Sequence, residues 1–172
     1  MAGTVAIGIQ QFNEIRKKGY FYIDKTAFIR EWWEKGDSVT LITRPRRFGK
    51  TLTMSMVEFF SVKYAGQQNL FEGLAIWETK AYREIQGTYP VISLSFANLK
   101  EPSYELTRQK VCDQLQQLYT EHAYILESGI LKGADKSFFE RMLHNEKVEY
   151  VDATLALYKL SSFMYQYYGK KV

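Results

Sequence analysis

Residues 38–52 read SVTLITRPRRFGKTL, and this stretch decides the fold that we expect for the 172-residue chain. The β-branched run 39–43 has the length and composition of a buried strand. A loop must follow, because Pro45 lacks the backbone N–H that a strand ladder needs. Gly49 then opens a helix in which Leu52, Met56 and Phe59 recur on one side. The order strand, loop, helix is typical of an α/β protein.

The rest of the sequence predicts further strands and helices. A short apolar run at 90–96 predicts a second strand covered on both faces, and 20–23 predicts a smaller one. Helical spacing predicts one helix from Ser103, another beginning at Asp135 or Ser137, and a long one over 148–168 that Gly169 ends. No repeat or linker interrupts the chain, so we expect residues 1–172 to form part of a single domain with a three-layer α/β/α architecture.

Composition and charge exclude several classes of protein. The chain is 46% hydrophobic and 24% charged, which is typical of a globular protein and not of a disordered one. No run of about 18 apolar residues occurs, so no membrane segment is expected. A lone Cys112 rules out an internal disulfide and favours the cytoplasm, and neither histidine has zinc-ligand spacing. The net charge of +4 is too mild to identify a nucleic-acid partner.

Residues 44–51 match most of the phosphate-loop pattern G-x-x-x-x-G-K-[ST], with Arg44 in place of the first glycine. The free amides and dipole at the start of a helix attract phosphate, and Gly49 permits close backbone approach. Lys50 would reach the β- and γ-phosphates of ATP, and the Thr51 hydroxyl would ligate Mg²⁺. We therefore expect Lys50 to be catalytic, Thr51 to be the metal ligand, and the nucleotide to be bound by Arg44, Pro45, Arg46, Arg47, Phe48, Gly49, Lys50, Thr51 and Leu52.

Two other interpretations of this loop stay open. The Gly-Lys-Thr triplet alone is common by chance, and it also fits an ordinary junction between a loop and a helix. The three arginines at 44, 46 and 47 also fit a nucleic-acid-binding or interaction module that does not turn over nucleotide. A lysine in the first turn opposes the helix dipole, however, so a bound anion there would explain its presence.

Several spaced motifs resemble one family of bacterial proteins, the predicted AAA-ATPase-like family. They include GYFYIDKT at 19–26, TRPRRFGKTL at 43–52, LFEGL at 70–74, YPVISLSF at 89–96 and YGKKV at 168–172. The resemblance spans nearly the whole chain, and Arg44 in the first glycine position is part of the family pattern. It implies a P-loop ATPase core that binds ATP and Mg²⁺.

The resemblance also implies what should follow these residues. A Walker B strand ending in acidic residues would come directly after 168–172, and a restriction-endonuclease-like nuclease domain often lies further on, which would link the longer protein to nucleic acid. We find no substitute acidic strand end, because 91–96 leads to Ala97 and Asn98. We therefore expect an amino-terminal part of the domain, truncated before Walker B, with slow or absent hydrolysis by this chain alone. Open edges on strands 39–43 and 90–96 would favour self-association.

Overall fold

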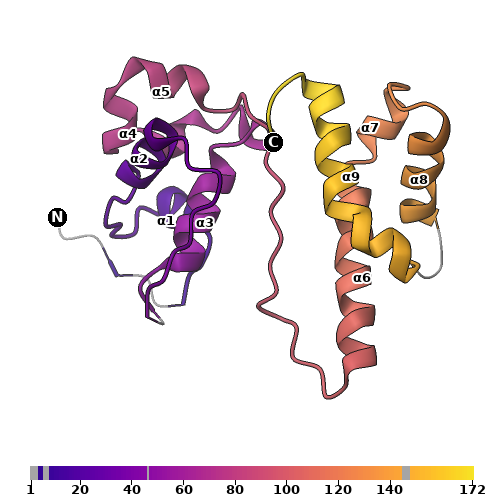
Figure 1. Cartoon of the computed structure of the whole chain (residues 1–172). Coiled ribbons are helices and arrows are strands. Elements are labelled where there is room, and N and C mark those ends of the chain that lie inside the picture. The colour runs from indigo at the N-terminus through magenta and orange to yellow at the C-terminus, as the bar shows by residue number, and fades with distance from the viewer. Residues whose placement is uncertain (1–3, 6–7, 46, 145–147) are drawn as a thin grey trace. The chain divides into compact units, whose positions relative to one another are not determined.

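The computed structural model describes residues 4–5, 8–45, 47–144 and 148–172. Within these residues the regular secondary structure is helical. These helices belong to two compact units, residues 1–91 and residues 92–172 (Figure 1). Each unit has its own apolar core. The two units are described separately below. Whether residues 1–172 are part of a single domain stays a prediction.

The expected three-layer α/β/α architecture is wrong, because no strand or sheet is present among the described residues. β-branched composition favours a strand only where a second backbone pairs with it. Val39 and Leu41 instead expose 87% and 82% of their surface. Ile92 packs against helices of the second unit, and the backbone oxygen of Ser95 accepts a hydrogen bond from Gln114 at 3.0 Å. Without strands in the described chain, the expected self-association through strand edges loses its structural basis.

The first unit consists of short helices joined by turns. Its α-helices are α1 (Phe12–Lys17), α2 (Ala27–Lys35), α3 (Lys50–Phe59), α4 (Ala75–Glu78) and α5 (Lys80–Ile85), and its 3₁₀ turns are η1 (Val62–Tyr64) and η2 (Gln68–Phe71). The helix expected after Gly49 is confirmed as α3, and its apolar side, with Met56 and Phe59, is buried as predicted.

Aromatic rings form the centre of the first core. Phe71 is fully buried, and its ring centroid lies 5.2 Å from those of both Phe12 and Phe60. Phe59 stacks on Tyr64 at 4.1 Å. Each such pair contributes roughly 0.5–1.5 kcal/mol beyond the area it buries. This cluster holds α1, α3 and η2 together where no sheet does.

Side chains that bond to backbone groups complete the first unit. The Ser55 hydroxyl of α3 accepts from the backbone N–H of Phe12 at 3.1 Å, which satisfies a free amide at the start of α1. At the carboxyl end of α3, the buried Gln86 amide donates to the oxygens of Phe59 and Tyr64, both at 3.2 Å. The middle and the carboxyl end of α3 are thus tied to distant segments.

Gly87 follows Gln86 at a close approach of two backbone segments. Its φ is +76°, and a Cβ placed there would lie 2.6 Å from the Cα of Ala65. Its N–H donates to the oxygen of Phe60 at 3.0 Å. The contact is with backbone, which cannot swing aside as a long side chain can. Gly73 has nearly the same φ, +75°, but a Cβ placed there would have no atom within 4 Å.

The two glycines therefore allow steric clash to be measured apart from backbone strain. Gly73→Ala carries only the left-handed penalty, about 1–2 kcal/mol. Gly87→Ala adds overpacking against Ala65, about 1–3 kcal/mol more. We expect the free energy of unfolding to fall further for Gly87→Ala than for Gly73→Ala in urea denaturation. Equal losses in the two variants would contradict the close approach at Ala65.

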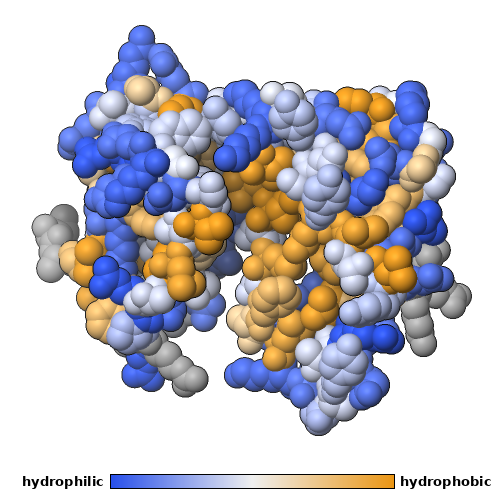
Figure 2. Space-filling view, in the orientation of Figure 1, coloured by the Kyte–Doolittle hydropathy of each residue, from blue (hydrophilic) through white to orange (hydrophobic). Residues whose placement is uncertain are grey.

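The described residues of the second unit form four helices. Figure 2 shows that apolar side chains also lie on the surface of this unit, including over its last helix. The core unites Tyr119, Phe139 and Phe163, all fully buried. Val151, Leu155 and Leu157 remain exposed. The helices are α6 (Tyr104–Glu121), α7 (Tyr124–Glu127), α8 (Gly133–His144) and α9 (Tyr150–Tyr168). The helix expected from Ser103 and the one expected to end at Gly169 are confirmed as α6 and α9.

Polar contacts fix α9 against its neighbours in this unit. The buried Tyr119 hydroxyl donates to the backbone oxygen of Ala156 at 2.8 Å. Arg141 of α8 forms two hydrogen bonds with Asp152, at 2.9 and 3.0 Å, and Lys159 donates to Asp135 of α8 at 2.8 Å. Asp152 and Lys159, the charged residues of α9, are therefore both paired within the second unit. The candidate site lies in the first unit.

Candidate phosphate-binding site

The expected loop lies immediately before α3, in the first unit. Its side chains at 44, 45, 47 and 48 are exposed, as are those of Lys50 and Thr51. Leu52 is different, because it is half-buried and packs against the aromatic core. It therefore anchors the helix in the core. Arg46, the remaining residue of the expected set, lies outside the described residues.

The start of α3 has the free amides that an anion needs. Gly49 is the N-cap residue, with φ of +74°, and its oxygen accepts from the backbone N–H of Thr53 at 2.9 Å and from the Thr53 hydroxyl at 3.0 Å. The amides of the first turn precede this first helical bond and have no partner within the helix. No side chain among the described residues caps them.

The loop turns sharply just before the helix. Arg47 has φ of +70°, which makes it the one non-glycine residue with positive φ among those described. Such a conformation costs an arginine roughly 1–2 kcal/mol. Phe48 thus lies between two left-handed residues, Arg47 and Gly49. Strained backbone of this kind is concentrated at functional sites, where the surrounding structure stabilises it.

Two lysines bind the loop through its backbone oxygens. The Lys50 ammonium reaches back and donates to the oxygen of Arg44, at 2.5 Å. The Lys25 ammonium, from the segment before α2, donates to the oxygen of Phe48 at 2.9 Å. An ammonium has three donors, so each lysine retains others for a ligand. The two contacts hold the loop near its first residue and near its last.

The charge around the loop is not neutralised by carboxylates. Among the described residues, Lys25, Arg44, Arg47 and Lys50 form no ion pair, whereas Lys80, Lys110 and Lys136 each pair with a glutamate elsewhere in the chain. Four cations near one helix start produce a positive potential to which the helix dipole adds. Such a site suits a compact polyanion.

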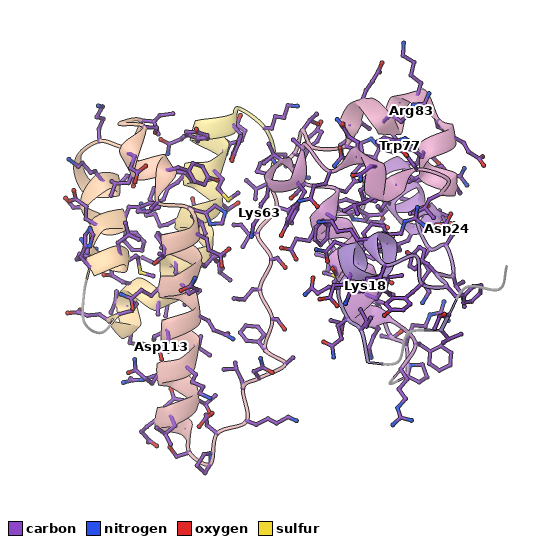
Figure 3. The ribbon with its side chains drawn as sticks, turned by 180° about the vertical axis from the view of Figure 1, so that it is seen from behind. Lys18, Asp24, Lys63, Trp77, Arg83 and Asp113 are labelled. Carbon is purple, nitrogen blue, oxygen red and sulfur yellow. The ribbon has the colours of Figure 1, made fainter. Side chains whose placement is uncertain are left out.

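Lys25 is the site residue that the phosphate-loop pattern does not identify. The neighbours of Lys25 fix its backbone: Asp24 accepts from the Ala75 N–H at 2.7 Å and from the Thr26 N–H at 2.8 Å, and the buried Thr26 hydroxyl accepts from the Ile76 N–H at 3.1 Å. Figure 3 shows Asp24 beside the short α4. The available signal in the sequence was the Asp24-Lys25-Thr26 triplet after the apolar run 20–23, far from the loop along the chain.

The environment of Asp24 shifts its pKa. Partial burial would raise the pKa, but the hydrogen bonds from the Ala75 amide and from the hydroxyl and amide of Thr26 outweigh it, so the pKa lies below its ordinary value of 3.8. The ionised form is therefore the one that stabilises the fold. That contribution is complete above the unfolded-state pKa and is lost as the pH falls through the lower folded-state pKa.

Replacing Asp24 tests this contact and its pH dependence. Asp24→Ala removes the acceptor for these amides, and we expect it to lower the free energy of unfolding by about 0.5–2 kcal/mol at pH 7, as loss of a helix cap does. The difference from wild type should shrink as the pH falls from 3.8 through the lower folded-state pKa, because the folded carboxylate becomes protonated there. Urea denaturation at pH 7 and at pH 3 measures both effects. A difference that is unchanged at pH 3 would contradict the role of the charge.

Comparison with known proteins identifies the family of the chain. The model of the predicted AAA-ATPase family matches residues 6–154, and this chain belongs to that family. A protein of Azotobacter chroococcum mcd 1, described as "Uncharacterized protein in vnfD 5'region", is 39% identical over 92 residues. The match covers 52% of this chain and 16% of that protein. No solved structure matches the chain.

The described residues contain neither a metal-binding cluster nor a membrane-spanning helix. No group of three or more of their His, Cys, Asp or Glu side chains is arranged to hold a metal ion. Within the same residues, no helix is long and apolar enough to cross a membrane. Cationic groups and backbone amides characterise the site as the structure describes it.

Proposed function

We propose that residues 44–51 bind the phosphates of a nucleoside triphosphate, ATP in the first instance, together with Mg²⁺. One observation carries the proposal: the uncapped start of α3 is surrounded by cations that no described carboxylate neutralises. Membership of the predicted AAA-ATPase family supports it. The proposal concerns this loop and does not depend on the sheet that the sequence pattern predicts.

Each residue of the loop has a separate role in this proposal. The amides of Lys50 and Thr51 point along the helix axis toward the phosphate, where the dipole favours negative charge. Gly49 lacks a Cβ, so the phosphate can approach the backbone. The Lys50 ammonium bonds to β- and γ-phosphate oxygens with donors that the Arg44 oxygen does not use.

Thr51 and the arginines complete the proposed site. Thr51 is exposed in the first turn of α3, and its hydroxyl is a hard oxygen ligand of the kind that Mg²⁺ prefers. Arg44 and Arg47 supply the charge that offsets the polyphosphate, and Arg44 takes the position of the usual first glycine. Hydrolysis needs an acidic or water-positioning group as well, and the proposal for this chain is therefore limited to nucleotide binding.

Thermal stabilisation by nucleotide tests the proposal. At about one hundred times its dissociation constant, ATP with Mg²⁺ should add about 2.7 kcal/mol of stability and raise the melting temperature by roughly 5–10 °C. Lys50→Ala should abolish this shift, because the variant loses the ammonium that bonds to the phosphates. Lys18→Ala is the matched control, since Lys18 is also exposed but follows α1. A wild-type chain that ATP does not stabilise would contradict the proposal.

If the loop instead binds nucleic acid, the same protein should behave differently. Arg47→Ala would then weaken a salt-dependent complex with DNA, and ATP would leave that complex unchanged. Fluorescence polarisation with a labelled oligonucleotide, measured at two salt concentrations, separates the two interpretations. If ATP instead displaces the oligonucleotide from the protein, both anions use the loop.

A further inference from the structure

The contact between Lys25 and the Phe48 oxygen determines more than the position of the loop. Lys25 reaches that oxygen at 2.9 Å across 23 residues of sequence, and its backbone is fixed by the hydrogen bonds of Asp24 and Thr26. The donor is therefore attached to a rigid part of the first unit. Lys25 is half-buried, which limits the alternative positions of its side chain.

The bonded oxygen belongs to the peptide unit that joins Phe48 to Gly49. A trans peptide is planar, and its C=O and N–H point in opposite directions. No cis peptide occurs among the described residues. With the oxygen turned toward Lys25, the N–H of Gly49 must point to the opposite side. One hydrogen bond thus sets the direction of an amide next to the start of α3.

This peptide unit is free to adopt the reverse orientation unless something holds it. Rotation of the unit changes ψ of Phe48 and φ of Gly49, and glycine tolerates both signs of φ. In the reversed orientation the carbonyl would turn away from Lys25, toward the side that the N–H now faces. A carbonyl oxygen repels a phosphate where an N–H would attract it. The loop therefore needs a group that selects one orientation.

We propose that Lys25 is a positioning residue of the phosphate-binding loop: it holds the Phe48 carbonyl and so presents the Gly49 N–H to the anion. This inference rests on the proposed function of the loop. The geometry at Gly49 agrees with this contact, because a Cβ placed there would lie 2.8 Å from the Lys25 nitrogen. The ammonium therefore lies directly against the backbone at Gly49.

Three variants of Lys25 test this role against the matched control Lys18→Met. Lys25→Met keeps the length of the side chain but not the donor, and ATP with Mg²⁺ should bind about tenfold more weakly, as expected for loss of one charge-assisted hydrogen bond. Lys25→Arg retains a charged donor and should bind within about threefold of wild type. Lys25→Leu, which also lacks a donor, replaces Lys25→Met in the test if the latter does not fold. Calorimetric titration measures the affinities.

A measurement without nucleotide separates positioning from simple charge. We expect the ¹H–¹⁵N resonance of Gly49 to move in nucleotide-free Lys25→Met and to stay near its wild-type position in Lys25→Arg and Lys18→Met. If Lys25 acts only by attracting the anion, Lys25→Met should weaken binding without moving the Gly49 resonance. This result would overturn the inference. Failure of Lys25→Arg to restore binding would overturn it as well.

The outcomes also distinguish this inference from the proposed function. Wild-type chain and Lys25→Met that bind ATP equally well would overturn the role of Lys25 and leave nucleotide binding intact. A wild-type chain without saturable binding would overturn the proposed function and, with it, the role of Lys25. Weaker binding in Lys25→Met, rescue in Lys25→Arg and a displaced Gly49 resonance together support the inference.

Discussion

Three consecutive side chains, those of Asp24, Lys25 and Thr26, hold the first unit together at the point where its function is proposed. Asp24 and Thr26 bind the amides of Ala75 and Ile76 at the start of α4, and Lys25 binds the loop before α3. A unit of short helices has few backbone hydrogen bonds between its segments. Side chains that bond to backbone groups therefore replace the long-range bonds that a sheet would supply.

Helix patterns were predictable from the sequence, and strand patterns were not. The long helices α6 and α9 have apolar residues at intervals of three and four. This periodicity is visible in a single segment and does not depend on a partner segment. A strand needs a second segment, which composition does not identify. Residues 39–43 and 90–96 have β-branched and apolar side chains, yet Val39 is exposed and Ile92 packs against helices. Propensity was present in both runs, and pairing was absent from the described chain.

The candidate site was predictable where it is local in sequence. The loop, Gly49 as the helix N-cap and Lys50 in the first turn follow from one short pattern. Lys25 does not, because it enters the site from a segment whose position depends on the contacts of Asp24 and Thr26. Leu52 was expected both on the apolar side of the helix and among the nucleotide-binding residues; its packing against the aromatic core confirms the first expectation, and the second stays a prediction.

In the second unit, the two ion pairs between α8 and α9 have opposite polarity. In the first pair α8 carries the cation, because its Arg141 pairs with Asp152 of α9. In the second pair α8 carries the anion, because its Asp135 pairs with Lys159 of α9. Asp152 and Lys159 are seven residues apart, so they lie on the same side of α9 two turns from each other. Sliding one helix by two turns would bring Arg141 to Lys159, and like charges would meet. The order of charges therefore specifies a single antiparallel register for the pair, which apolar packing alone would leave ambiguous.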